Sequence, residues 1–314
     1  MAAVPTTLCS FWHDPDDTPA FVARCLANLR RVHARTAWTV VVLSDADVPA
    51  DRADVRALAP CHRADWIRLR WLAQHGGVWM DSTCVCFAPV DCWVDRRNAD
   101  GWDLQGFATS FDADLAENWA LAAPRGNAFV AACFDAFDLA VRTGFEWWCS
   151  IHYDEIPPSL KHGFLPYLTM HAVIAVLRRR LGGRVRLLPP VPLGVQIRDG
   201  WDGAAARRLA TGRDVAALCG GCFCKLRSVE WRALSVDDLD PASDLGRWLG
   251  DDDDDVTDHV EITEGNQVDA LDPRDDVARG VAIATDTDAC WWWLAALVAL
   301  MLVGGGVVAA RRTR

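Results

Sequence analysis

Tyrosine is scarce in this chain, with 2 copies among 314 residues, whereas tryptophan occurs 16 times. The sequence also lacks low-complexity bulk, which argues against a fibrous or largely disordered protein. Hydrophobic residues make up 51% of the chain and charged residues 24%, as in a globular protein. The length suits one large domain or two small ones. We interpret the tryptophan excess as a habit in which Trp takes positions that other proteins give to Tyr or Phe.

A block of basic residues is also missing. The net charge is −11, and residues 251–276 account for all of it, with 12 acidic side chains against Arg274 alone. The remainder of the chain is therefore neutral overall. Because a nucleic-acid-binding protein needs a positive field or patch, we expect no nucleic acid partner.

No secretory signal is visible at the N-terminus, since residues 1–5 (Met-Ala-Ala-Val-Pro) include no basic residue and no long apolar run. We therefore expect the 12 cysteines to be mainly reduced core residues. Cys219, Cys222 and Cys224 have spacings that zinc ligands can have. A second closely spaced pair does not accompany them, which disfavours a zinc site.

The composition divides the chain into zones: 1–248, a domain of alternating strand-like and helix-like segments; 249–288, an acidic flexible linker; 289–311, a transmembrane anchor; 312–314, a basic tail. The linker is acidic and poor in large apolar groups, so we expect it to be solvated and extended. Within the anchor, residues 290–310 are 21 consecutive uncharged residues. As a helix they span about 30 Å, the thickness of the bilayer hydrocarbon. We expect a single-pass membrane protein anchored at its C-terminus.

The flanks of this segment agree with a membrane span. Trp291, Trp292 and Trp293 lie at one end as an aromatic belt does, and arginines close the other end. The basic tail favours a cytosolic C-terminus, with the large domain on the other side of the membrane. A single C-terminal span without an N-terminal signal predicts the opposite orientation, so the side of the membrane stays open. A buried core helix is the alternative to a span.

The first 80 residues alternate between strand-like and helix-like segments. We expect strands at 8–12, 38–43 and 78–80, and helices at 19–32 and 66–72. The β-branched run in 38–43 is typical of a buried parallel strand. Alternation of this kind predicts a parallel sheet with right-handed crossovers, which binds ligands beyond the carboxyl ends of its strands.

One segment, residues 64–83, has the residue types that a ligand site needs. Asp65 and Arg68 are three residues apart, so on a helix they share a face and can act on one ligand. Two glycines at 76–77 allow a sharp turn from helix to strand. The strand then presents Asp81, followed by Ser82 and Thr83, at its end. A carboxylate in that place can hold a divalent cation or a ribose hydroxyl.

This segment resembles the DXD region of the sugar-transferase superfamily, Ser-Asp-x-x-Arg…Gly-Gly-x-Tyr-x-Asp-x-Asp. It is most similar to the capsular polysaccharide synthesis protein branch, which usually ends in Trp-Ile-Asp-Ala-Thr where this chain has Trp-Met-Asp-Ser-Thr at 79–83. Further blocks that resemble the family lie at 11–25, 117–124, 167–171 and 224–226, so the likeness covers roughly residues 7–230.

The resemblance implies an α/β domain of the Rossmann-like GT-A type, with a mostly parallel sheet flanked by helices. It implies a glycosyltransferase, a hexosyltransferase that retains the anomeric configuration, which moves a sugar from a nucleotide-sugar donor to a glycan, lipid or protein acceptor. It also implies these roles: Asp65 and Arg68 contact the donor sugar; Trp79 lines the nucleotide pocket; Asp81 binds the ribose and a metal; Asn118 and Trp119 lie near the transferred sugar and the diphosphate.

The chain departs from the DXD pattern at Thr83, which replaces the second acid. Mg²⁺ and Mn²⁺ prefer charged oxygen ligands, and a hydroxyl is a weaker ligand than a carboxylate. Asp81 can bind the divalent cation with help from waters and the donor diphosphate. Alternatively, Lys225 or an arginine neutralises the leaving diphosphate.

Each candidate also has a structural interpretation. Asp65 and Arg68 can form a surface ion pair, and Asp81 can cap a loop. Trp79 and the pair Asn118–Trp119 can be packing residues. Lys225 can face solvent and His171 can be a satisfied, half-buried helix residue. Two other functions also stay open: a catalytically inactive membrane protein that binds sugar nucleotides or glycans, and a membrane scaffold that recruits a partner through its acidic linker.

Overall fold

The computed structural model describes residues 2–161, 163–201 and 203–250. Residues 1–250 form one compact unit. The predicted linker beyond residue 250, the predicted anchor 289–311 and the tail 312–314 lie outside the described residues. Within the described part of the chain, no helix is both long enough and apolar enough to cross a membrane.

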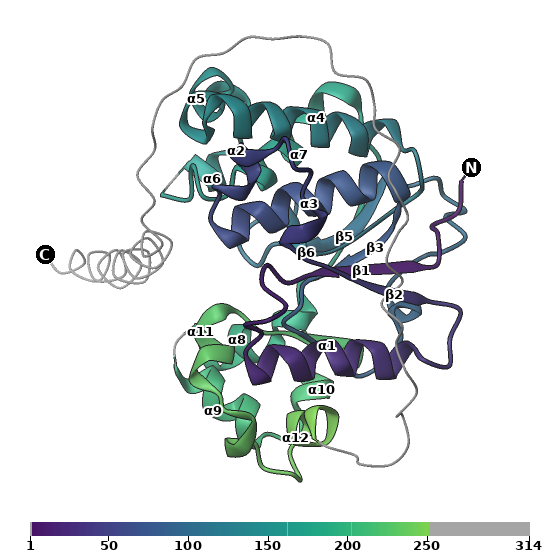
Figure 1. Cartoon of the computed structure of the whole chain (residues 1–314), viewed down its shortest axis with the longest axis vertical. Helices are drawn as coiled ribbons and strands as arrows, with labels where there is room; N and C mark the ends of the chain where they lie inside the picture. Colours follow the sequence, from purple (N-terminus) through teal and green to yellow (C-terminus); the bar gives the residue numbers. More distant parts are fainter. Residues whose placement is uncertain (1, 162, 202, 251–314) are drawn as a thin grey trace, which may run out of the picture. The chain divides into compact units, whose positions relative to one another are not determined.

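A six-stranded sheet forms the centre of the unit, with strand order β2-β1-β3-β6-β5-β7 (Figure 1). Its strands are β1 Thr7–Phe11, β2 Thr39–Leu43, β3 Gly77–Met80, β5 Leu104–Ala108, β6 Ala116–Ala123 and β7 Val185–Leu188. The pairs β1·β2, β1·β3 and β5·β7 are parallel, and β6 runs antiparallel to both of its neighbours. The predicted α/β class with a mostly parallel sheet flanked by helices is therefore confirmed.

A second, two-stranded sheet pairs β4 Cys84–Cys86 with β8 Phe223–Lys225 in antiparallel register. The helices are α1 Ala20–His33, α2 Ala53–Arg56, α3 Pro60–His75, α4 Ala128–Thr143, α5 Phe145–Ile151, α6 Pro158–Lys161, α7 Thr169–Leu181, α8 Gly194–Asp199, α9 Gly203–Thr211, α10 Val215–Leu218, α11 Ser228–Ala233 and α12 Asp244–Leu249.

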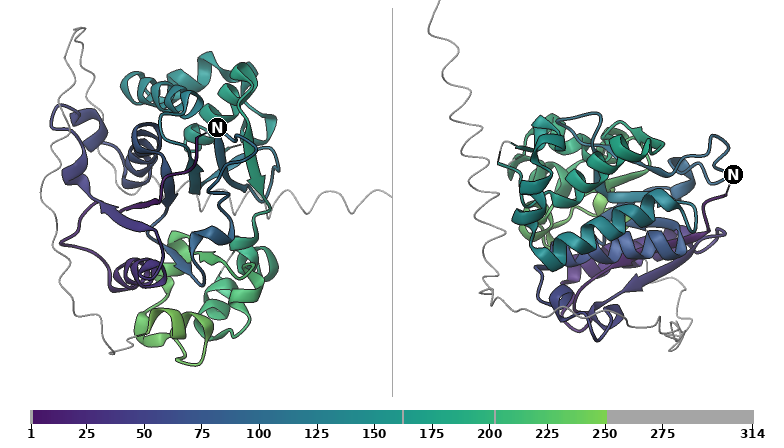
Figure 2. Two further views of the ribbon diagram at one scale, coloured as in Figure 1. Left: turned by 90° about the vertical axis from the view of Figure 1, so that its right-hand side faces the viewer. Right: turned by 90° about the horizontal axis from the view of Figure 1, so that it is seen from above.

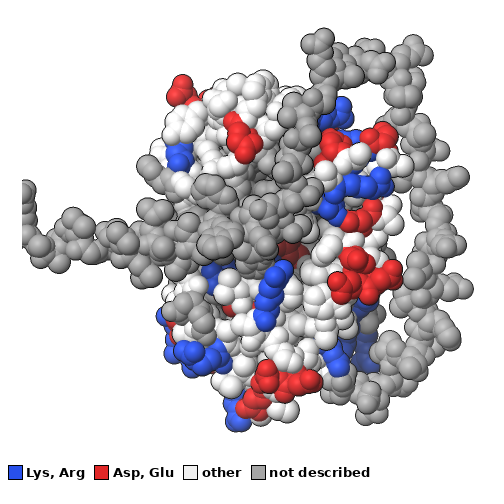
Figure 3. All heavy atoms as spheres, turned by 60° about the vertical axis from the view of Figure 1, so that its left-hand side comes forward, with Lys and Arg blue, Asp and Glu red and all other residues white. Residues whose placement is uncertain are grey.

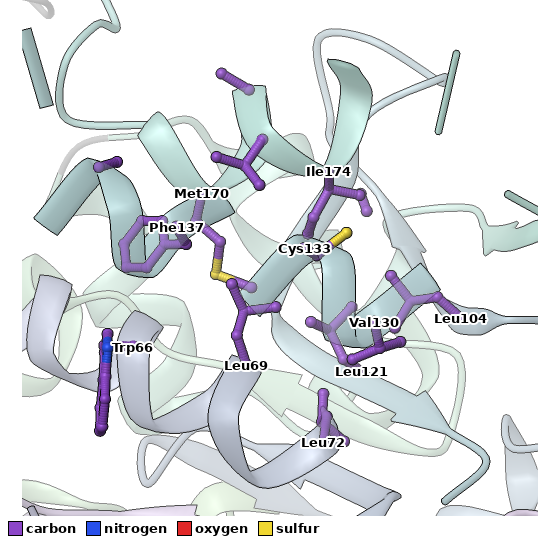
Figure 4. Packing of buried hydrophobic residues seen from close by; sticks show 14 of the residues in the cluster. Trp66, Leu69, Leu72, Leu104, Leu121, Val130, Cys133, Phe137, Met170 and Ile174 are labelled. Atoms are coloured by element: carbon purple, nitrogen blue, oxygen red, sulfur yellow. The ribbon is translucent and has the colours of Figure 1, made fainter. Parts of the chain in front are cut away.

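Helices cover both faces of the large sheet (Figure 1). On one face, α3 packs on α4 and α4 packs on α7. The other face carries α1, which contacts α12, and the helices from α8 to α12, as the two further views in Figure 2 also show. The layer of α3, α4 and α7 encloses the largest hydrophobic core. Figure 4 labels some of its members on these helices: Leu69, Leu72, Val130, Cys133, Phe137, Met170 and Ile174.

The connection from α3 to β3 explains why two glycines occur in sequence. Gly76 and Gly77 have φ values of +64° and +88°, which residues with a Cβ rarely adopt. A Cβ on Gly77 would lie 2.4 Å from the carbonyl oxygen of Thr7. The predicted sharp turn is thus confirmed, and it brings β3 against β1 directly after the helix.

The predicted elements exist, with two differences. Helix α3 starts at Pro60 rather than 66, because a proline fits the first turn of a helix, where its missing N–H has no partner to lose. Strand β2, predicted as a buried strand, lies at the sheet edge, and Val40 to Leu43 are only half-buried. The same β-branched run therefore serves an edge strand, since β-branched side chains suit either position.

Cysteines contribute mainly to the cores. Those buried without a disulfide are Cys9, Cys25, Cys84, Cys86, Cys133, Cys149, Cys219 and Cys224. Burial raises the pKa of the Cys84 thiol to about 12. Cys92 and Cys222 form a disulfide, with a Cα–Cα distance of 6.0 Å, so the prediction of reduced cysteines is wrong for this pair. Cys222 is thereby excluded as a zinc ligand, and no metal-type cluster of His, Cys, Asp or Glu occurs among the described residues.

Candidate active site

The predicted site lies where two parallel strands end. Cys9 of β1 pairs with Trp79 of β3, so the carboxyl ends of both strands reach the same edge of the sheet. Asp81 follows β3 directly, and its backbone N–H donates to the carbonyl oxygen of Trp119 on β6 at 2.9 Å. Ligands of open α/β sheets bind at such strand ends, so Asp81 stands where the sequence placed a ligand group.

Three donors from different parts of the chain hold the Asp81 carboxylate. Oδ1 accepts hydrogen bonds from Arg68 Nη2 at 2.7 Å and from Trp79 Nε1 at 3.0 Å. Oδ2 accepts from Lys225 Nζ at 2.8 Å. The Asp81 side chain keeps 23% of its surface exposed, against 2% for Arg68 and 11% for Lys225. Asp81 is thus the member of this group that an incoming ligand meets first.

The surroundings keep Asp81 ionised. Burial opposes its charge, but the nearby Lys225 ammonium and then the Arg68 guanidinium outweigh burial and lower the pKa of Asp81 to about 2. For Lys225, burial favours the neutral form, yet the Asp81 carboxylate raises the pKa of this lysine above its ordinary value. Both groups therefore carry their charges at neutral pH.

Asp65 and Arg68 form the second layer of this network. Arg68 bridges the two carboxylates, donating from Nη1 to Asp65 and from Nη2 to Asp81. Asn118 Nδ2 donates to Asp65 Oδ1 at 2.9 Å. The structure thus joins four of the predicted site residues, Asp65, Arg68, Asp81 and Asn118. Asp65 is 5% exposed and Arg68 2%, so they are not a surface ion pair. Because both side chains are buried, they act on a ligand through Asp81.

Both predicted tryptophans lie in the interior. Trp79 is 1% exposed, and the guanidinium carbon of Arg68 lies 4.9 Å from the centre of its ring. Its indole N–H donates to Asp81. Trp119 is 4% exposed and packs against Phe107 and Phe223. Neither ring is open to a nucleotide or a diphosphate here. The residues support the site, Trp79 through its hydrogen bond and Trp119 through its backbone and packing.

Lys225 reaches the site from 144 residues further along the chain. The pairing of β8 with β4 places Lys225 opposite Cys84, three residues after Asp81. Its ammonium donates to Thr83 Oγ1 at 2.9 Å as well as to Asp81. Thr83 Oγ1 in turn donates to the carbonyl oxygen of Leu226 at 2.8 Å. Lys225 therefore bridges the two positions that the DXD motif gives to acids, and it does not face solvent.

These residues do not fit a divalent cation. Both oxygens of Asp81 already accept hydrogen bonds from cationic side chains, and the hydroxyl of Thr83 faces the Lys225 ammonium. Asp65 is bound to Arg68 and Asn118. Two carboxylates against two cations leave no surplus negative charge, whereas Mg²⁺ and Mn²⁺ sites need charged oxygen ligands. The metal role predicted for Asp81 thus has no ligand set around it.

Two further groups border the network, although the sequence assigned them no part in it. His62 Nδ1 lies 3.8 Å from Asp65 Oδ2, at the start of α3. Glu117, next to Asn118 on β6, lies 3.8 Å from His171 Nε2. The one available signal for Glu117 was its place in the block 117–124, which resembles the family and also contains Asn118. His171 is 4% exposed, in keeping with a packed helix residue.

The comparisons with known proteins concern the same region. Residues 8–138 match the family model of capsular polysaccharide synthesis proteins. The matched stretch runs from β1 into α4 and contains Asp65, Arg68, Asp81 and Asn118, while Lys225 lies beyond it. The resemblance predicted from the sequence is thereby confirmed over residues 8–138, whereas the blocks at 167–171 and 224–226 lie outside the match. No curated protein matches the chain.

Two solved structures match the chain at low sequence identity and low TM-score. A glycosyltransferase involved in the glycosylation of the major capsid of PBCV-1 is 11% identical, with a TM-score of 0.37, over 73% of this chain and 97% of its own. The PaToxG glycosyltransferase is 11% identical, with a TM-score of 0.33, over 58% of this chain and 80% of its own. Both TM-scores are too low for a residue-by-residue transfer.

A separate hollow of about 410 Å³ opens elsewhere on the unit, lined by residues that include Asp112, Asp114, Arg178 and Arg179. None of the predicted site residues lines it. Charged side chains of both signs are interspersed on the face shown in Figure 3, wherever described residues are visible. The Asp81 network is therefore distinguished by its connected charges, not by the size of a cavity.

Proposed function

We propose that this protein is a glycosyltransferase of the GT-A type that moves a sugar, a hexose, from a nucleotide-sugar donor to a hydroxyl of a glycan, lipid or protein. The observation that carries the proposal is Asp81, a partly exposed carboxylate at the carboxyl end of β3 that is fixed by Arg68 and Lys225. The match of residues 8–138 to a polysaccharide synthesis family supports it.

The charges suit a nucleotide diphosphate. Arg68 and Lys225 place two cations at one strand end, and cations there offset the negative charge that grows on a departing diphosphate. Asp81 can accept about one more hydrogen bond, from a ribose or sugar hydroxyl, since an ionised carboxylate accepts up to about four and Arg68, Trp79 and Lys225 supply three. We further propose that the sugar is transferred with retention, which proton NMR of the anomeric centre of the product tests directly.

We also propose that residues 289–311 tether the enzyme to a membrane, on the strength of the uncharged run 290–310 and its tryptophan and arginine flanks. Vesicle flotation tests this. The full chain should float with phospholipid vesicles and a chain ending at residue 288 should not. Equal behaviour of the two chains would contradict the tether and leave the transferase proposal untouched.

The test of the transferase proposal is a turnover assay on the full chain with labelled UDP- and GDP-sugars. We expect transfer or slow hydrolysis of one donor, and we expect Asp81→Asn to lower the rate about 100-fold or more, the loss typical for one group that stabilises a transition state. Asp238→Asn is the matched control, because Asp238 is exposed on a surface turn. No turnover with any donor, or an equal rate for Asp81→Asn, would contradict the proposal.

One observation favours a second candidate. Every charge in the network already has an opposite partner within it, and Thr83 replaces an acid. A catalytically inactive protein that binds sugar nucleotides or glycans would show this arrangement too. Calorimetry separates the two, since the inactive protein would bind donor while turnover stays at background.

A further inference from the structure

The chain contains only two lysines, Lys161 and Lys225, and one of them is buried against Asp81. Its other basic residues are arginines. Lys225 is buried, and its ammonium lies within hydrogen-bond distance of Asp81 Oδ2 and Thr83 Oγ1. The ammonium of a lysine is a compact point charge, whereas the guanidinium of an arginine is planar and spreads its charge over a rigid fork of donors.

Hydrogen bonds with neighbouring residues hold Lys225 and its ammonium in place. Thr83 turns its hydroxyl hydrogen to Leu226, so a lone pair of Oγ1 faces Lys225. Gln196 Nε2 donates to the backbone carbonyl of Lys225 at 2.9 Å, which fixes the strand that carries it. Gln196 is fully buried, as the neighbouring β8 residue Cys224 is. The ammonium is thus positioned by two elements rather than held by chance on a flexible surface.

We propose that Lys225 is the resident cation of the transfer site, and that it takes the place of the divalent metal toward the donor diphosphate. The inference rests on the proposed function. It fits the change at position 83, because the Thr83 hydroxyl accepts a hydrogen bond from the ammonium, whereas a carboxylate would be the stronger ligand for a divalent ion. It also explains why the described residues provide no ligand set for a metal.

The sugar transfer can be written with all atoms and electrons accounted for and no metal ion. The bond between the sugar C1 and the diphosphate oxygen breaks, and its electron pair stays on that oxygen. The acceptor oxygen bonds to C1, and its proton passes to the diphosphate and then to solvent. Lys225 keeps its own three protons and stabilises the negative charge on the departing oxygen through hydrogen bonding and charge.

The test is calorimetric titration of the metal-free full chain with UDP and GDP, in excess EDTA and then with Mn²⁺. We expect one nucleotide to bind in EDTA, with an affinity that Mn²⁺ changes by less than about threefold. Lys225→Gln should weaken binding about tenfold or more, as loss of a charge-assisted contact does. Lys161→Gln is the matched control, because Lys161 lies over the Tyr153 ring, and it should bind as the unsubstituted chain does.

Selective NMR of the lysine side chains gives a second measurement that needs no variant. The unsubstituted chain should show two lysine signals, and addition of the nucleotide in EDTA should shift the Lys225 signal while leaving that of Lys161 in place. Binding that appears only with Mn²⁺, or a Lys225 signal that does not respond, would overturn this inference and leave the proposed function standing. Absence of binding under both conditions would overturn both.

Discussion

At the scale of single residues, some side chains of the site act on Asp81 and not directly on a ligand. Trp79 is the clearest case, because its ring is buried while its indole N–H reaches the carboxylate. The sequence placed Trp79 beside the site, but burial decides between touching a nucleotide and holding Asp81. Periodicity and motif spacing do not encode this difference, which depends on helix α3 closing over the ring.

The Trp79 bond yields a prediction with a matched control. Trp79→Phe removes one donor to Asp81 and should lower transfer about tenfold, since a hydrogen bond to a charged group contributes about 1.5–3 kcal/mol. Trp66→Phe loses a similar bond, from Trp66 Nε1 to Asp138 at 2.6 Å, away from the site. Steady-state kinetics and thermal unfolding of both variants check this. Equal rate losses in the two variants would contradict a role for Trp79 at Asp81.

His33 predicts how stability depends on pH. It is 1% exposed, its Nδ1 lies 2.7 Å from the Leu29 carbonyl oxygen, and its Nε2 accepts from the Val90 N–H. Both bonds need the neutral ring with hydrogen on Nδ1. Burial lowers the pKa of His33 below its ordinary 6.5, although the Leu29 carbonyl and Asp91 oppose this.

The sign of the pH effect follows from proton binding. Below about pH 6.5 the unfolded chain takes up a proton that the folded chain excludes, so the free energy of unfolding should fall as the pH decreases from there. Above that pH the His33 contribution is constant. Thermal unfolding from pH 5 to 8 checks this, and His33→Gln should flatten the profile. An identical acid-side slope in the variant would contradict the assignment.

At the scale of elements, the sequence was most informative where backbone geometry demands one residue type. Gly76 and Gly77 mark the turn from α3 into β3, and the structure confirms that turn. The β2 run was less informative, because Val-Val-Val suits a central or an edge strand alike. The β4·β8 pairing could not be predicted, since two strands of three residues that lie far apart in sequence have no local signal. The sequence therefore named Lys225 as a candidate but could not predict that it lies beside Asp81.

The α3–β3 turn yields a prediction about folding. Gly77→Ala should destabilise the protein by several kcal/mol, because its Cβ would lie 2.4 Å from the Thr7 carbonyl oxygen at a φ of +88°. Gly182→Ala is the control, since that glycine also has a positive φ but open space around it, and it should lose about 1–2 kcal/mol. Urea unfolding measures both. Similar losses would contradict the close approach of β1 and β3.

At the scale of the whole molecule, residues 1–250 carry their own sheet, both helical layers and the complete Asp81 network. A chain that ends at residue 250 should therefore unfold in one cooperative transition, at a temperature close to that of the same unit in the full chain. Calorimetry and circular dichroism check this. A broad transition without a heat-absorption peak would show that the unit needs the remainder of the chain.

The central claim is that a nucleotide sugar binds at the carboxyl ends of β1 and β3, against Asp81 and Lys225. A crystal structure of the protein with its bound donor or nucleoside diphosphate tests it most directly. The account predicts diphosphate oxygens within hydrogen-bond distance of the Lys225 ammonium, with no metal ion between them, and a donor hydroxyl on Asp81. A nucleotide bound away from this strand edge would contradict the account.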